Sequence, residues 1–88
     1  MKIACLCCGY FTYEGDTEES ILYDICEVCF WGYELGAITD LDMKGGANDV
    51  SLNEARVNYK KYKVCKPRLI GKNVVREPLP EELPENNE

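Results

Sequence analysis

The sequence predicts a small α+β fold with a β-hairpin, one amphipathic α-helix and a short C-terminal hairpin or extended tail. Three observations support this fold class. Two short segments before residue 26 are rich in aromatic and β-branched residues, apolar residues recur with helical spacing after residue 50, and 88 residues allow one small domain. Such a chain buries only about two-thirds of the surface that it exposes when unfolded. We therefore expect a metal, disulfides or a partner to supplement a marginal core.

The hairpin is predicted from residues 10–13 and 21–25, where the aromatic and β-branched side chains are concentrated. The intervening residues 14–20 are polar and include a glycine, as expected of a turn. Residues 30–33 are expected to add a third short strand. Residues 36–49 contain three glycines and have no clear period, which favours a loop.

The helix is predicted to begin at Ser51 and to end near Lys63. Ser51 and Glu54 have the spacing of a capping box, in which each side chain accepts a hydrogen bond from a backbone N–H of the first turn. Pro67 follows soon after Lys63, and proline cannot continue a helix. Between these limits, apolar residues at 3-4-3 spacing define one buried stripe: Leu52, Ala55, Tyr59 and Tyr62.

The C-terminal region is predicted to contain a short hairpin followed by a tail. Residues 69–70 and 74–75 are apolar and flank a Gly-Lys-Asn turn. Residues 77–88 contain five glutamates, three prolines and no base, a composition typical of an acidic, extended Pro/Glu-rich tail. We therefore divide the chain into a cysteine-rich domain, residues 1–76, and an acidic tail, residues 77–88.

The composition excludes the commonest tools of catalysis. The chain has no histidine, and so it has no Ser-His-Asp triad, no Cys-His pair and no imidazole general base. We expect a protein that is not an enzyme. No secretory cleavage pattern follows the N-terminal apolar run, and no apolar stretch approaches the roughly 20 residues of a membrane helix. These features predict a cytoplasmic protein with reduced thiols and no membrane partner.

Two Cys-x-x-Cys motifs carry the strongest chemical signal. The first pairs Cys5 with Cys8 and is followed by Gly9, and the second pairs Cys26 with Cys29. Two residues between thiolates allow a tight turn, called a knuckle, in which both sulfurs face one ion about 2.3 Å away. The separation of the motifs also fits that of four-thiolate zinc sites. We therefore predict that these four cysteines bind a structural zinc ion, with free thiols or a disulfide as the alternatives.

The spacing of the two motifs assigns no role to the two remaining cysteines, Cys7 and Cys65. Cys7 lies inside the first motif and could compete with Cys5 or Cys8 for the metal, although a packed thiol is the simpler interpretation. Cys65 follows the predicted helix and is expected to pack against the core. A regulatory disulfide between Cys7 and Cys65 is a further hypothesis that nothing in the sequence favours over two free thiols.

Charge is strongly polarised along the chain, and this pattern suggests a partner. The formal net charge of −6 divides into an acidic segment 1–54, a segment 55–76 with eight bases and no acid, and an acidic segment 77–88. Opposite charges within one chain most often pair with each other. The remaining acidic surface nevertheless predicts a protein partner, and the basic segment offers nucleic acid as an alternative partner. The candidate partner-binding residues are Trp31, Lys60, Lys61 and Lys63.

Motifs along nearly the whole chain resemble the cysteine-rich CPCC family of small bacterial proteins. They are Cys5-Leu6-Cys7-Cys8-Gly9-Tyr10, Ile25-Cys26-Glu27-Val28-Cys29-Phe30-Trp31, Lys44-Gly45-Gly46-Ala47-Asn48 leading into Val50-Ser51-Leu52-Asn53-Glu54-Ala55-Arg56, Cys65, and Arg76 with Pro78-Leu79-Pro80. The family signature has proline where this chain has Leu6. The resemblance implies a small zinc-binding, zinc-ribbon-like domain and implies no defined activity.

The first knuckle, with Gly9 and Tyr10 after it, also looks like the start of a rubredoxin, which binds iron through four cysteines. The second knuckle departs from that pattern because Phe30 stands where glycine would be expected.

The sequence therefore supports four functional hypotheses. The first is a zinc-binding protein-interaction module that regulates a partner or neutralises a toxin, as an immunity protein or antitoxin does. The alternatives are a rubredoxin-like electron carrier, a zinc ribbon that binds nucleic acid through residues 55–76, and a thiol-redox enzyme that uses one Cys-x-x-Cys motif.

Overall fold

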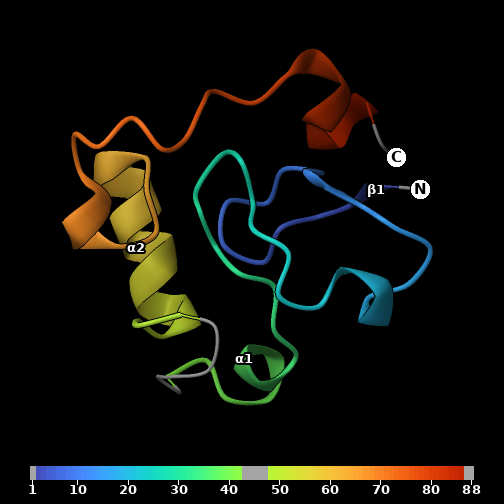
Figure 1. The fold of residues 1–88 in the computed structure, drawn as a ribbon, viewed down its shortest axis with the longest axis horizontal. Helices are drawn as coiled ribbons and strands as arrows, with labels where there is room; N and C mark the ends of the chain where they lie inside the picture. Colours follow the sequence, from blue (N-terminus) through green and yellow to red (C-terminus); the bar gives the residue numbers. More distant parts are fainter. Residues whose placement is uncertain (1, 43–47, 87–88) are drawn as a thin grey trace.

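The computed structural model of the chain describes residues 2–42 and 48–86. Figure 1 shows α2 on one side of the molecule, the N-terminal half of the chain beside it, and the C-terminal segment crossing above both to end near the N-terminus. The elements in chain order are β1 (Lys2–Ile3), β2 (Tyr13–Glu14), η1 (Glu19–Ile21), α1 (Gly36–Thr39), α2 (Leu52–Tyr62), η2 (Pro67–Leu69), η3 (Pro80–Glu82) and η4 (Pro84–Asn86), where η denotes a 3₁₀ helix.

The hairpin forms, but with different partners from those that the sequence predicted. β1 and β2 are antiparallel, with Lys2 opposite Glu14 and Ile3 opposite Tyr13. Only Tyr13 of the predicted strand 10–13 is in a strand, and the proposed partner segment 21–25 begins at the end of η1. The prediction was wrong because it placed the chain reversal in the polar segment. The first knuckle itself reverses the chain, and therefore the residues on either side of it pair.

The second knuckle is flanked in the same way. Ile25 and Gly32 form an isolated antiparallel bridge, which replaces the third strand expected over residues 30–33. Each Cys-x-x-Cys motif thus lies at the tip of its own short antiparallel ladder. The fold class is confirmed at the level of a two-stranded antiparallel hairpin, a principal helix and a cysteine cluster.

The helix prediction is confirmed at both ends. The Ser51 hydroxyl accepts a hydrogen bond from the Glu54 amide, and the Glu54 carboxylate accepts one from the Ser51 amide, which completes the capping box. Lys63 takes a left-handed conformation, and its N–H bonds to the Tyr59 carbonyl, which ends the helix. The predicted stripe is correct except at its last position, because Tyr62 is 47% exposed.

The connecting segments differ more from expectation. The loop predicted over residues 36–49 contains the short helix α1, and residues 43–47 of it lie outside the described residues. The short hairpin predicted after residue 68 does not form among the described residues. Instead η2 is followed by two positive-φ positions, Gly71 and Asn73, and then by an extended segment. The acidic C-terminal residues form two 3₁₀ turns, η3 and η4.

The core is built around the cysteines. Trp31, Ile21 and Leu52 are fully buried and belong to one cluster with five of the six cysteines as buried members. Trp31 was a candidate for partner binding, but its complete burial means that it offers no surface to a partner. In the described part of the chain, no helix is both long enough and apolar enough to span a bilayer.

Candidate metal centre

The two knuckles share one backbone design. In each, the amide of the residue after the second cysteine donates to the carbonyl of the first cysteine, from Gly9 to Cys5 at 2.9 Å and from Phe30 to Cys26 at 2.8 Å. Both of these residues have positive φ, at 84° for Gly9 and 76° for Phe30. Glycine takes this conformation without strain, whereas a bulky side chain such as that of Phe30 seldom does.

This design brings four sulfur atoms together. The Sγ atoms of Cys5, Cys8, Cys26 and Cys29 all lie within 4.8 Å of one another. The Sγ–Sγ distances are 3.5 Å between Cys5 and Cys29 and 3.8 Å between Cys8 and Cys26. Four sulfurs at about 2.3 Å from a tetrahedral ion would lie about 3.8 Å apart. The residues therefore fit a tetrahedral ion of this size, and all four predicted positions are brought to one place.

Hydrogen bonds concentrate on Cys26. Its Sγ atom lies 3.0 Å from the Thr12 hydroxyl oxygen and accepts a hydrogen bond from the Val28 amide at 3.4 Å. Hydrogen bonds from the neighbouring thiols, first that of Cys29, lower the pKa of Cys26 because they stabilise its thiolate form. The same pairing with Cys26 raises the pKa of Cys29, because it favours the protonated form of that thiol. The hydrogen bonds within the cluster thus favour the thiolate form of Cys26.

Cys7 and Cys65 lie near the four-sulfur cluster but do not belong to it. Both are buried, and neither belongs to the group of sulfurs that lie within 4.8 Å of one another. The Cys65 amide donates to the Cys29 carbonyl at 2.9 Å, which ties the end of α2 to the second knuckle. Burial raises the pKa of Cys65 to about 12, so this thiol is protonated at neutral pH.

Asn48 positions the second knuckle, and the sequence analysis assigned it no such role. Its side chain is buried and forms two hydrogen bonds with the Gly32 backbone, one from the Gly32 N–H and one to its carbonyl, each at 2.9 Å. It also donates to the Glu34 carboxylate at 3.3 Å. An asparagine amide can mimic a backbone partner in this way, and here it completes the outer edge of the ladder beside the knuckle.

A second group that was not expected from the sequence links the second knuckle, and the segment after the first knuckle, to the C-terminal segment. Arg76 donates two hydrogen bonds of 2.8 Å to the buried Glu82 carboxylate and two more to Glu27, at 2.8 and 3.1 Å. The Arg76 amide donates to the Glu27 carbonyl, and the Phe11 amide donates to the Glu82 carbonyl. We call Arg76, Glu82 and Glu27 the clasp. The contact with Arg76 lowers the pKa of Glu82 because it favours the ionised carboxylate.

The candidate lysines lie on and after α2, away from the cluster. Lys60, Lys61 and Lys63 are exposed, and the Lys63 ammonium lies 5.4 Å from the centre of the Tyr59 ring. The structure therefore makes these three side chains accessible, in contrast to Trp31.

A model of the family described as cysteine-rich CPCC matches residues 3–82. This span covers nearly the whole chain and includes both knuckles, α2 and the clasp, and the protein belongs to this family. The resemblance inferred from the sequence motifs is thereby confirmed. A search of curated proteins found no match to the chain.

Proposed function

We propose that this protein is a non-enzymatic, zinc-ribbon-like module that binds one zinc ion through Cys5, Cys8, Cys26 and Cys29. The observation that carries the proposal is the cluster of four sulfurs within 4.8 Å of one another. When bound, zinc would supply structural cross-linking of the two knuckles. Four thiolates fill its coordination sphere, which leaves no position for a substrate and favours a role in folding over catalysis.

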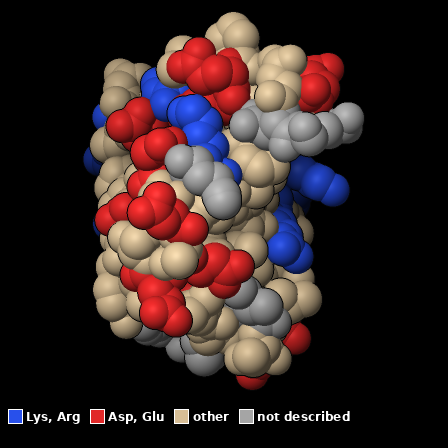
Figure 2. Space-filling view, turned by 90° about the vertical axis from the view of Figure 1, so that its right-hand side faces the viewer, with Lys and Arg blue, Asp and Glu red and all other residues tan. Residues whose placement is uncertain are grey.

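The partner of the module is proposed to be a protein with a basic surface. Figure 2 shows carboxylates gathered along one side of the molecule, with basic side chains next to the upper carboxylates and at the opposite edge. From the end of β2 to the start of η1, the exposed acidic residues include Glu14, Asp16, Glu18 and Glu19. An acidic face of this kind steers a basic partner and accelerates its association. A toxin with a basic active surface is one class of partner that such a face would neutralise.

Affinity capture with the zinc-loaded protein tests this part of the proposal. We expect a captured protein whose binding weakens steeply with salt and weakens again in a Glu18→Gln/Glu19→Gln variant. A Lys60→Gln/Lys61→Gln variant is the matched control, because it changes the same number of charges on the exposed face of α2. Loss of binding only in the lysine variant, together with a gel shift of nucleic acid, would instead favour the nucleic-acid alternative.

Iron is the alternative metal, because the two knuckles have the same turn and four thiolates bind either ion. A rubredoxin-like carrier would be coloured when oxidised. We expect a colourless preparation with zinc, and strong visible thiolate-to-iron absorption in protein isolated from its native host would overturn the zinc assignment.

A further inference from the structure

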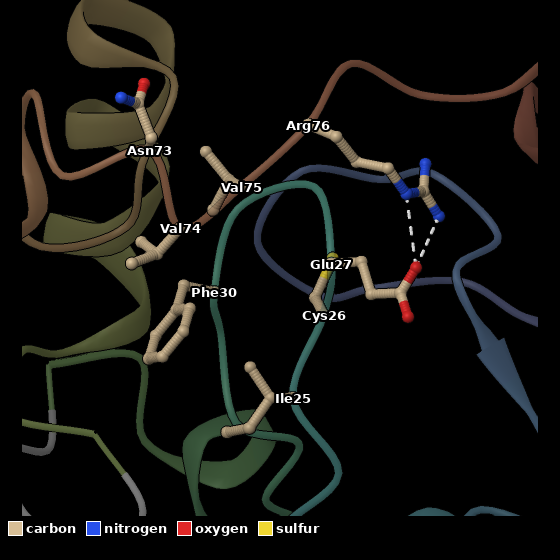
Figure 3. Close-up of a pocket in the computed structure, with 8 residues that line it drawn as sticks. All are labelled: Ile25, Cys26, Glu27, Phe30, Asn73, Val74, Val75 and Arg76. Carbon is tan, nitrogen blue, oxygen red and sulfur yellow. Dashed lines mark hydrogen bonds and ion pairs between the residues drawn. The ribbon is translucent and has the colours of Figure 1, made fainter.

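A hollow beside the second knuckle is lined by exposed and half-buried apolar side chains that are not among the four clustered cysteines. It has a volume of about 500 Å³ and lies between the knuckle and the extended segment after Asn73. Figure 3 shows Ile25 and Phe30 on the knuckle side and Val74 and Val75 on the other, with Glu27 and Arg76 at one end. Ile25 is 47% exposed and Val74 is 41% exposed. We call this hollow the knuckle groove.

Backbone groups along both walls of the knuckle groove have no partner. Within residues 2–42 and 48–86, no hydrogen bond reaches the backbone of Val74 or Val75. The same holds for Ile25, because the bonds of its bridge to Gly32 are made by the neighbouring residues. In such a bridge, the N–H and C=O of Ile25 point away from Gly32, toward the open edge. The two walls thus present unpaired backbone N–H and C=O groups to which a strand could be added.

Phe30 supports a role for this groove. Phe30 takes the positive-φ conformation that Gly9 takes at the same position of the first knuckle. A Cβ atom placed on Gly9 would meet nothing within 4 Å. A bulky residue in this conformation costs on the order of 1 kcal/mol, and such strain concentrates at functional sites. The ring is only partly buried and lines the groove. Glycine at position 30 would remove this strain, but the chain has an aromatic residue there, and its ring lines the groove.

The charges around the groove indicate what it binds. Asp24 is exposed next to Ile25, and the Glu27 side chain is 71% exposed at the end of the groove. Glu77 is also exposed, and the Arg76 guanidinium is bound by both Glu27 and Glu82. The only other cation adjoining the lining residues in sequence is Lys72. The surroundings are therefore acidic and favour a basic ligand.

We propose that the knuckle groove binds an extended peptide segment of a partner protein by β-strand addition. The segment would pair its backbone with the free edges at Ile25 or at Val74 and Val75, place alternate apolar side chains against Phe30, and present a flanking Lys or Arg to Asp24 and Glu27. This inference rests on the proposed function as an interaction module, and it names the surface and the chemistry of its partner.

Selection from a displayed library of random 12-residue peptides, with the zinc-loaded full chain as bait, provides the probe. The expected binders alternate apolar residues next to Lys or Arg. An Ile25→Asp or a Val74→Asp variant is expected to weaken a selected peptide at least about tenfold, as truncation of central interface residues does. Val57→Asp is the matched control, because Val57 is 50% exposed on α2 and is not among the residues that line the groove, and it should leave affinity unchanged.

Two measurements keep the test independent of how the variants fold. N-methylation of alternate amides in the peptide should abolish binding, and the peptide should shift the amide NMR signals of Ile25, Val74 and Val75 in the unaltered protein. Selection that yields no common pattern, insensitivity to N-methylation, or shifts confined to other residues would overturn the groove proposal. A partner captured by the acidic face with unchanged affinity for Ile25→Asp would overturn only the groove and leave the proposed function intact.

Discussion

Replacement of Glu82 by glutamine is expected to destabilise the protein by about 2 kcal/mol. The Glu82 side chain is 4% exposed and accepts two hydrogen bonds from Arg76 and one from the Leu79 amide. Hydrogen bonds to charged groups contribute about 1.5–3 kcal/mol each. Removal of one partner of a buried ion pair costs more, because the other charge is left without a partner. We take a value near the lower end because Arg76 is one-third exposed and keeps its bonds to Glu27.

Urea unfolding of the zinc-loaded protein, followed by the fluorescence of the single buried Trp31, measures this effect. With a denaturant slope of about 2 kcal/mol/M, the midpoint should fall by about 1 M. Glu27→Gln is the matched control, because Glu27 binds the same guanidinium from an exposed position and should cost at most about 1 kcal/mol. Equal effects of the two substitutions would refute the reasoning, since burial of the carboxylate is its basis.

The sign of the pH dependence follows from the same contact. Arg76 lowers the pKa of Glu82, so the stabilisation is present above the unfolded value of about 4.3 and is lost only as the pH falls through the lower folded value. The difference in stability between the wild-type protein and Glu82→Gln should therefore be the same at pH 8 and pH 6. A difference that grows or shrinks between these two values would mean that another group carries it.

Three further substitutions test the site. Cys65→Ala should leave one zinc per chain by elemental analysis, because this protonated thiol lies outside the sulfur cluster, and a lower zinc content would make it a ligand. Asn48→Ala should cost about 2–4 kcal/mol in urea unfolding, because it leaves two buried backbone groups unpaired, and a cost below 1 kcal/mol would argue against this anchoring role. Thr12→Val should keep the zinc but weaken its binding about tenfold in competition with a chelator, since it removes the hydroxyl beside Cys26, and unchanged affinity would dismiss that contact.

The cluster of four cysteines was predictable from the sequence because its determinants are local. Two residues between paired cysteines fix the shape of each knuckle, and therefore Cys5, Cys8, Cys26 and Cys29 could be selected without knowledge of the fold. The start of α2 was predictable for the same reason, since the capping box joins residues three positions apart.

The strand pairing and the anchors were not predictable in this way. β1 is two residues long, and so it has no alternating pattern that could identify it. Asn48 and Glu82 act on backbone or side chains 16 and 6 residues away, and nothing in their local sequence indicates those partners. The family motif around Arg76 marked the right region, but the contacts that explain the clasp appear only in three dimensions.

Native mass spectrometry combined with elemental analysis, before and after treatment with a chelator, tests the central claim most directly. We expect one zinc ion per chain, and we expect its removal to abolish cooperative unfolding and the far-ultraviolet circular dichroism of α2, because metal binding and folding are coupled in small four-thiolate domains. A chain that retains its fold and thermal transition without metal, or that carries iron or a second ion per chain, would contradict the account.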